Sequence, residues 1–201
     1  MKKLTHKFAA AVLALAFLCT GASAAVSHTV VAGDTMWKLA VKYKVGTSEI
    51  IKANSQITNP NLIYPGQTLT IPTLDTSVTA YETEVVRLVN VQRSQNGLAP
   101  LTMNWELSRV ARYKSQDMVD KKYFSHTSPT YGSPFDMMKA FGITYRTAGE
   151  NIAYGQRTPQ EVVTAWMNSS GHRANILNSS FTQIGVGYVA AGNYWTQMFI
   201  G

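Results

Sequence analysis

The chain has 201 residues, of which 45% are hydrophobic and 14% are charged, with 18 Lys and Arg against 11 Asp and Glu. This apolar content can build hydrophobic cores, and the length allows one small and one medium domain. The charges are scattered, without a block of five or six of one sign, which argues against a nucleic-acid-binding tail.

The first 24 residues have the pattern of a secretory signal. Three lysines within residues 1–7 precede an apolar run over residues 8–18, and Ala22-Ser23-Ala24 supplies small residues for cleavage. The run is shorter than the ~20 residues of a membrane-spanning helix, and no other segment is apolar enough to cross a membrane. We therefore expect a secreted protein whose mature chain begins at Ala25.

Cys19 is the only cysteine and lies inside this signal. Leu18 precedes it, where lipid-modification sites have a small residue, so lipidation is a minor alternative to cleavage after Ala24. Cleavage removes three lysines and leaves fifteen basic against eleven acidic residues, without a thiol or disulfide. Because small secreted eukaryotic domains usually depend on disulfides, this combination indicates a Gram-positive bacterium.

Composition divides the mature chain into two units. Residues 27–72 form one patterned unit, and a second apolar pattern runs over residues 80–201. Between them, residues 73–79 are rich in Thr and Ser without apolar periodicity, which is typical of a linker. There is no internal repeat, so each unit occurs once.

The small unit predicts a strand, two helices and a second strand within about 45 residues, which is near the lower size limit for a domain without disulfides or metals. A two-stranded sheet backed by two helices, a βααβ fold, satisfies this order. The cues are a strand at 28–32, a helix capped by Asp34 or Thr35 and closed by Gly46, a second helix capped by Thr47, and a closing strand at 68–71.

This unit resembles a LysM domain from end to end. The resemblance rests on the run from Val30 to Ala40, on Asn54, and on the run from Ile63 to Pro72. LysM domains bind polymers that contain N-acetylglucosamine, chiefly peptidoglycan and chitin. The resemblance implies a shallow sugar groove between two loops, formed by Gly33, Asp34, Thr35, Met36, Leu62, Ile63, Tyr64 and Pro65.

The loop residues have both a binding and a structural interpretation. Backbone groups of the turns can pair with N-acetyl groups and hydroxyls, while Met36, Ile63 and Tyr64 offer apolar surface to a sugar face. Alternatively, the glycines only shape turns and Met36 fills a core. We assign the groove to Asp34, Thr35, Ile63 and Tyr64, and the structural role to Gly33, Gly66 and Trp37.

The larger unit predicts helices first and a hairpin last, which indicates an α+β domain with a mostly antiparallel sheet. The cues, in chain order, are an amphipathic helix over 82–94, a long helix capped by Asn104, a helix from Ser133-Pro134 to Gly142, a capping box at 158–161 whose helix ends at Gly171, and strands at 184–188 and 194–200 joined by a turn at 191–193.

Two histidines of this unit are candidates for a functional cleft. His126 follows the long helix, His172 follows Gly171, and Glu150 lies between them in the chain. Each lies beside a turn, from which its side chain can point into a shared groove. A lone histidine is more often a structural hydrogen-bonding group, and spacing alone leaves both roles open.

The larger unit also resembles the bacterial branch of the CAP superfamily, the cysteine-rich secretory, antigen 5 and pathogenesis-related proteins, over residues 80–201. This family has an α-β-α sandwich, so the resemblance implies that architecture here. The motifs that carry it are Phe124-Ser125-His126, Gly149-Glu150-Asn151-Ile152, and the runs 89–101, 166–177 and 184–188.

Many eukaryotic members have a cleft with two histidines and two glutamates that can hold a divalent metal such as zinc. His126, Glu150 and His172 match three of these positions, while Ser169 stands at the fourth, and the disulfides of the family are missing. Two imidazoles and one carboxylate still make a chemically reasonable zinc site with an open position. The missing carboxylate weakens both the hypothesis of a metal site and that of an acid–base mechanism with two carboxylates.

Two functions follow as hypotheses. In the first, the LysM domain anchors the protein on peptidoglycan or a related polymer, in the cell wall or on the spore surface, and the CAP domain binds an unidentified ligand or protein partner there during growth or sporulation. In the second, the CAP domain is a wall-directed hydrolase that uses His126, Glu150 and His172. The mature chain lacks a thiol, a Gly-x-Ser-x-Gly elbow and a His-Glu-x-x-His helix, which favours the first.

Overall fold

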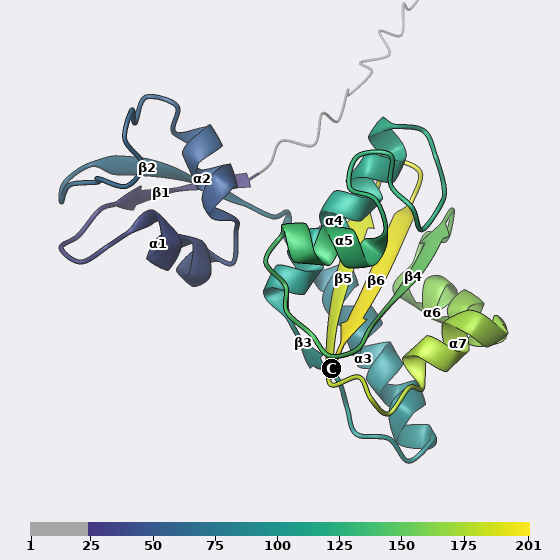
Figure 1. Cartoon of the computed structure of the whole chain (residues 1–201). Helices are drawn as coiled ribbons and strands as arrows, with labels where there is room; N and C mark the ends of the chain where they lie inside the picture. Colours follow the sequence, from purple (N-terminus) through teal and green to yellow (C-terminus); the bar gives the residue numbers. More distant parts are fainter. Residues whose placement is uncertain (1–23) are drawn as a thin grey trace, which may run out of the picture.

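A short connection joins a small domain and a larger one in the computed structural model, which describes residues 24–201 (Figure 1). The export signal predicted for residues 1–24 lies outside this part of the chain, except for Ala24, the first residue of β1. None of the helices in the described part is both long and apolar enough to span a bilayer.

The small domain has the predicted order of elements. Its two strands, β1 (Ala24–Thr29) and β2 (Thr68–Thr73), pair antiparallel over their whole length. The helices α1 (Met36–Tyr43) and α2 (Thr47–Ala53) pack on this sheet around a core that includes Leu39. The domain is therefore a βααβ unit, as predicted.

Some local boundaries differ from the prediction. The first strand ends at Thr29, before most of the predicted range 28–32. Thr35 caps α1 as predicted, but Lys44 in the left-handed conformation closes that helix, not Gly46. Gly46 is instead the N-cap of α2, where a Cβ would collide with neighbouring side chains.

The larger domain contains a four-stranded sheet in the order β3-β5-β6-β4, antiparallel except for the β3–β5 pair. Strand β4 is therefore an edge strand. The elements are α3 (Thr76–Gln95), β3 (Thr102–Met103), α4 (Trp105–Asp120), α5 (Pro134–Ala140), β4 (Ala148–Tyr154), α6 (Pro159–Asn168), α7 (Ser170–Ile176), β5 (Gln183–Val189) and β6 (Tyr194–Ile200).

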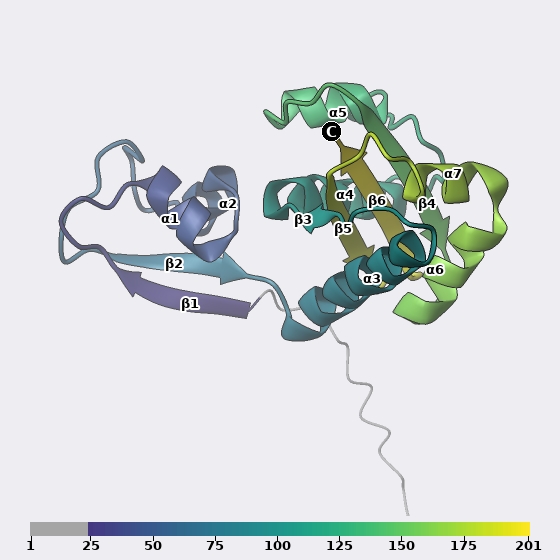
Figure 2. The same ribbon diagram turned by 90° about the horizontal axis from the view of Figure 1, so that it is seen from below.

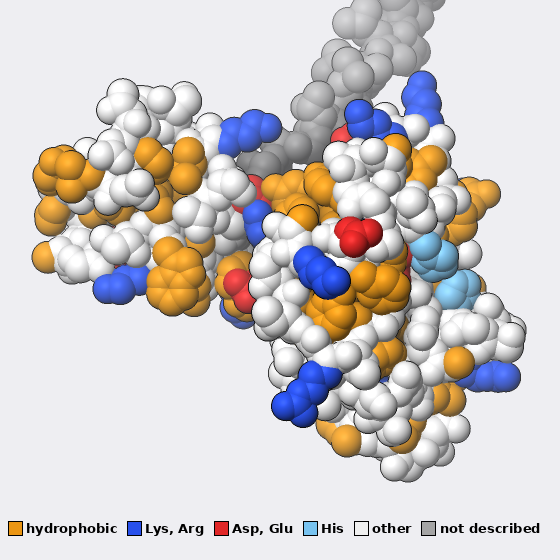
Figure 3. Space-filling model, in the orientation of Figure 1, with side chains coloured by type: hydrophobic (Ala, Val, Ile, Leu, Met, Phe, Trp, Pro, Cys, Tyr) orange, Lys and Arg blue, Asp and Glu red, His pale blue; other side chains and the backbone are white. Residues whose placement is uncertain are grey.

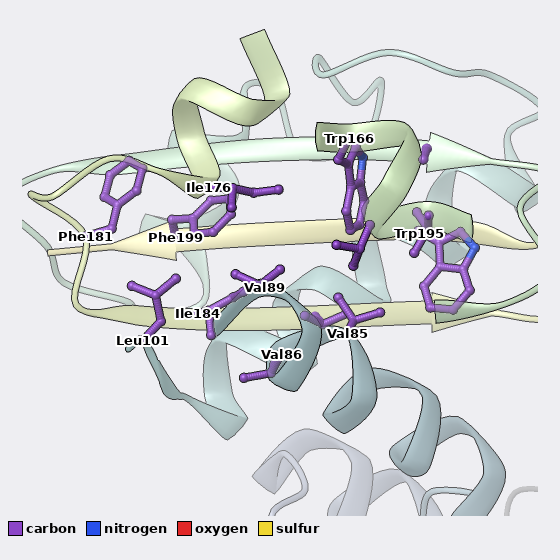
Figure 4. Packing of buried hydrophobic residues seen from close by; sticks show 14 residues of the cluster. Val85, Val86, Val89, Leu101, Trp166, Ile176, Phe181, Ile184, Trp195 and Phe199 are labelled. Atoms are coloured by element: carbon purple, nitrogen blue, oxygen red, sulfur yellow. The ribbon is translucent and has the colours of Figure 1, made fainter. Parts of the chain in front are cut away.

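Helices cover both faces of this sheet, so the domain is an α-β-α sandwich (Figure 2). On one face, α3, α6 and α7 pack on Trp195 and Phe199, with Trp166 of α6 directed into the same core (Figure 4). On the other face, α4 and α5 pack on Met198 and Ile200. Gly185 and Gly187 of β5 let the α4 backbone approach closely, because a Cβ at either position would overlap it.

The larger domain also departs from the prediction in places. Helix α3 begins at Thr76, so the second half of the predicted linker 73–79 is helical. Helix α6 ends at Asn168, and Gly171 lies inside a separate helix, α7. The predicted capping box is half formed: Thr158 accepts from the Glu161 amide, but Glu161 accepts from the Arg157 amide.

A salt bridge joins the two domains. Arg109 of α4 donates from Nε and Nη2 to the two carboxylate oxygens of Glu49 in α2, at 2.6 and 2.9 Å. The Tyr113 hydroxyl donates to the same carboxylate at 2.7 Å, and the Arg109 guanidinium lies over the Tyr113 and Phe141 rings. Because both partners are mostly buried and the geometry is bidentate, this contact fixes one domain against the other.

The pKa values of the contact indicate how it depends on pH. Burial raises the pKa of Glu49, but the hydrogen bonds from Arg109 and Tyr113 outweigh burial and hold it below the usual 4.5. Burial and the Glu49 carboxylate raise the pKa of Tyr113 to about 12. A carboxylate with a lowered pKa stabilises the folded contact above the unfolded pKa and loses that effect as pH falls through the lowered value.

We predict that Arg109→Ala releases the two domains, at a cost on the order of 1 kcal/mol in the domain contact. Small-angle scattering should show a larger mean radius for this variant than for the unchanged chain at neutral pH. The unchanged chain should approach the variant as pH falls below 4.5. The control Arg87→Ala removes an exposed pair within α3 and should have no effect; equal radii for all three proteins would contradict the prediction.

Candidate functional site

The predicted sugar-binding loops of the small domain differ in exposure. Leu62 and Tyr64 are 49% and 55% exposed, and Pro65 is exposed beside them, while Ile63 is half-buried against the core. Leu62 and Tyr64 border a hollow of about 410 Å³ whose other walls come from residues 56–59 and 67–68. Apolar side chains and polar groups thus meet on one open surface, as a sugar ligand requires.

Three residues of the other predicted loop hold the fold together. The Asp34 carboxylate accepts from the Val31 amide at 2.9 Å and lies 2.8 Å from His28 Nε2, and these two contacts lower its pKa. Thr35 caps α1 by accepting from the Lys38 amide. Met36 is 5% exposed and belongs to the core. Asp34 and Thr35 thus have structural contacts of their own, and their place in the groove remains a prediction, while Met36 fills the core as its structural interpretation expected.

Trp37 also differs from its predicted role. We assigned it a structural role, but its side chain is 66% exposed on α1. Gly33 has the positive φ of a turn glycine, at 89°, in agreement with its structural assignment. Large exposed apolar side chains of the small domain thus lie on α1, at Trp37, as well as on the loop before β2.

The larger domain brings His126 and Glu150 into direct contact. Glu150 lies in the edge strand β4, and His126 lies in the segment that follows α4. His126 Nδ1 is 2.8 Å from Glu150 Oε1, with side-chain exposures of 54% and 1%. An exposed imidazole is thus backed by a buried carboxylate, an arrangement that orients the ring.

A buried polar network fixes the segment that carries His126. Lys114 of α4 is fully buried, and its Nζ donates to the His126 carbonyl at 2.8 Å and to the Tyr123 hydroxyl at 3.2 Å. The Tyr123 hydroxyl donates to Asp117 at 2.6 Å, and Asp117 also accepts from the hydroxyls of residues 128 and 130. Lys114 and Asp117 were not predicted as part of the site, although charged residues on the buried face of an amphipathic helix are a usable signal.

Burial is the largest influence on the pKa values of Glu150 and His172. Burial raises the pKa of Glu150 against the opposing effects of His126 and Lys114, and its Oε2 has no hydrogen-bond partner among the described residues. Burial and the charge of His126 lower the pKa of His172 below its usual 6.5. At neutral pH His172 is therefore uncharged, and it lies close enough to His126 to respond to its charge.

His172 comes from the helical layer on the other face of the sheet from α4, the helix that precedes His126. It belongs to α7, which the Asn151 side chain ties to β4 by donating to the His172 carbonyl at 3.1 Å. His126 and His172 are the only histidines of the larger domain, and Figure 3 shows two histidine side chains next to each other on its surface. The two imidazoles thus lie near each other beside β4.

The proposed zinc ligands do not form a metal site in this arrangement. Within residues 24–201, no three His, Cys, Asp or Glu side chains are placed to hold one ion together. His126 and Glu150 already face each other, so the imidazole nitrogen nearest the carboxylate is engaged. The residues therefore do not fit the three-ligand zinc site considered from the sequence.

Comparison with known proteins identifies both domains. A model of the cysteine-rich secretory protein family, CAP, matches residues 86–199, and a LysM domain model matches residues 28–72. The chain belongs to the CAP family. Its LysM domain precedes the CAP domain, as the sequence predicted.

Relatives and solved structures agree with this assignment. The chain is 64% identical over 135 residues to the uncharacterized protein YkwD of Bacillus subtilis, covering 67% of this chain and 52% of that protein. It is 42% identical over 72 residues to the probable autolysin SsaALP of Staphylococcus aureus, covering 35% of this chain and 26% of that one. The crystal structure of an extracellular SCP-domain protein from Bacillus anthracis is similar at 34% identity and TM-score 0.60, covering 68% and 47% of the two chains. The chain thus spans about half the length, or less, of these proteins.

Because His126 affects the pKa of His172, the two imidazoles give a testable prediction. His172 should titrate below 6.5, and His126→Asn should raise its pKa, because one of the two causes of the lowering is removed. Nuclear magnetic resonance of the imidazole C–H groups against pH measures both. The control Lys52→Ala removes a positive charge from the small domain and should leave His172 unchanged. If the pKa of His172 is 6.5 or above and does not change in the His126→Asn variant, the two rings are not neighbours.

Proposed function

We propose that the LysM domain anchors this protein on the N-acetylglucosamine glycan of peptidoglycan, and that the CAP domain presents the surface around His126 and β4 to a ligand at the cell envelope. The observation that carries the proposal is the exposed Leu62–Tyr64 loop beside an open polar hollow. It offers flat apolar surface and hydrogen-bonding groups together, which are the two kinds of contact that a sugar ring needs.

Several further observations support a location outside the cell, at the wall. The sequence carries the pattern of an export signal at residues 1–24. One relative is named a probable autolysin, and one similar structure is described as an extracellular protein. The excess of basic residues that remains after cleavage, fifteen against eleven, suits an anionic wall as well. A place on the spore surface is a narrower version of the same proposal.

Hydrolysis of wall material is the second candidate function. His126 favours it, because an exposed imidazole backed by a buried carboxylate can accept a proton from water. His172, held neutral, can also accept a proton. However, Ser169 stands where a second carboxylate is found in relatives with two glutamates, so acid assistance to a leaving group has no assigned residue. Binding is therefore the primary proposal.

The anchor is tested by sedimentation of the full chain with purified peptidoglycan. We predict that Leu62→Ala with Tyr64→Ala lowers the pelleted fraction, with a loss of affinity of about tenfold, equivalent to ~1.4 kcal/mol. Val41→Ala, which removes another exposed apolar side chain of the small domain, is the matched control and should pellet normally.

Glycan anchoring and wall hydrolysis can each be contradicted by experiment. Unchanged pelleting of the Leu62/Tyr64 variant would remove the proposed anchor. For hydrolysis, the turbidity of a wall suspension should fall with the unchanged chain and stay constant with His126→Ala. Constant turbidity with both proteins would leave the CAP domain as a binding module.

A further inference from the structure

A cluster of three aromatic rings, two of them exposed, lies beside the His126–Glu150 pair of the CAP domain. Phe124 contacts Tyr154 with ring centroids 4.7 Å apart, and Tyr154 stacks on Tyr194 at 5.6 Å. Phe124 and Tyr154 are 46% and 55% exposed, whereas most other aromatic side chains of the domain are packed in its cores. We call these three residues the aromatic platform.

The aromatic platform and the His126–Glu150 pair are parts of one continuous surface. Glu150 and Tyr154 lie four residues apart in β4 and therefore point to the same face of the sheet, separated by about 13 Å. The segment after α4 runs alongside, so that His126 meets Glu150 and Phe124 meets Tyr154. Tyr194 joins from β6, directly opposite Tyr154 in the strand register. Hydrophobic side chains are exposed near the end of β4, beside the histidines (Figure 3).

The chemistry of the platform is amphipathic. Although the rings pack on one another, Phe124 and Tyr154 remain about half exposed and carry no charge, so their exposed apolar surface can contact the C–H face of a sugar ring. The hydroxyls of Tyr154 and Tyr194 make no hydrogen bond to another residue in the described part of the chain, so both remain available to a ligand. Tyrosines with a polar end of this kind are typical of surfaces that bind ligands with both apolar and polar groups.

We propose that the aromatic platform is a second glycan-binding site, for the same N-acetylated polymer that the LysM domain holds. This inference rests on the proposed anchoring function, because the anchor supplies the occupant. A wall strand bound by the small domain is present at high effective concentration near the larger one. The Glu49–Arg109 contact limits how far the two sites can separate. The platform then leads the glycan toward His126.

The test uses full-length protein and peptidoglycan stripped of anionic polymers, at high ionic strength so that charge attraction is screened. Four proteins are compared: the unchanged chain, the platform variant Phe124→Ala/Tyr154→Ala, the anchor variant Leu62→Ala/Tyr64→Ala, and the combination. We expect the platform variant to bind at least about fivefold more weakly than the unchanged chain, and the combination to bind more weakly than the anchor variant.

The controls separate this inference from the anchor and from other ligands. Phe135→Ala removes an exposed aromatic ring from α5 and should bind like the unchanged chain. Circular dichroism and the single variant Tyr154→Ala check that folding is intact. If the platform variant binds glycan normally, the inference of a second site is overturned. If the anchor variant binds weakly in the same experiment, the proposed LysM anchor is nevertheless supported. Loss of binding to phosphatidylglycerol vesicles, but not to glycan, also overturns it in favour of a lipid surface.

Discussion

The buried carboxylate of Glu150 at the sheet edge determines how the surface around β4 of the CAP domain is arranged. It is almost fully withdrawn from water, yet one of its oxygens contacts an imidazole that is half exposed. Because removing a charge from water is costly, the fold supplies His126 on one side and the positive charge of Lys114 behind it. The same lysine holds the His126 carbonyl, so the charge balance and the position of the ring depend on each other.

An edge strand makes this arrangement possible. At the centre of the sheet, the strands would separate the α4–α5 layer from the α3–α6–α7 layer. At β4, residues from both layers come around the edge: His126 from the segment after α4 and His172 from α7. The free edge also exposes Tyr154, which begins the aromatic platform. The domain contact through Glu49 and Arg109 then relates this face to the LysM domain.

Sequence was a good guide where a signal is local. The caps at Thr35, Asn104 and Ser133 were predictable because a side chain bonds an amide three residues away. The motifs also indicated both families. Strand β4 was missed because Gly149, Glu150 and Asn151 lack strand alternation and are placed by long-range pairing with β6. The structural role of Asp34 was likewise not predicted, because the turn between His28 and Asp34 is what brings their side chains into contact.

The proposed function depends most on the small domain being a glycan anchor whose binding surface is the loop before β2. Chemical-shift mapping of the full chain with soluble glycan strands released from peptidoglycan tests this residue by residue. The account predicts that the largest amide shifts fall on residues 56–68, with a second set around Tyr154 on β4. Shifts confined to the Gly33–Met36 turn, or absent from the small domain altogether, would contradict it.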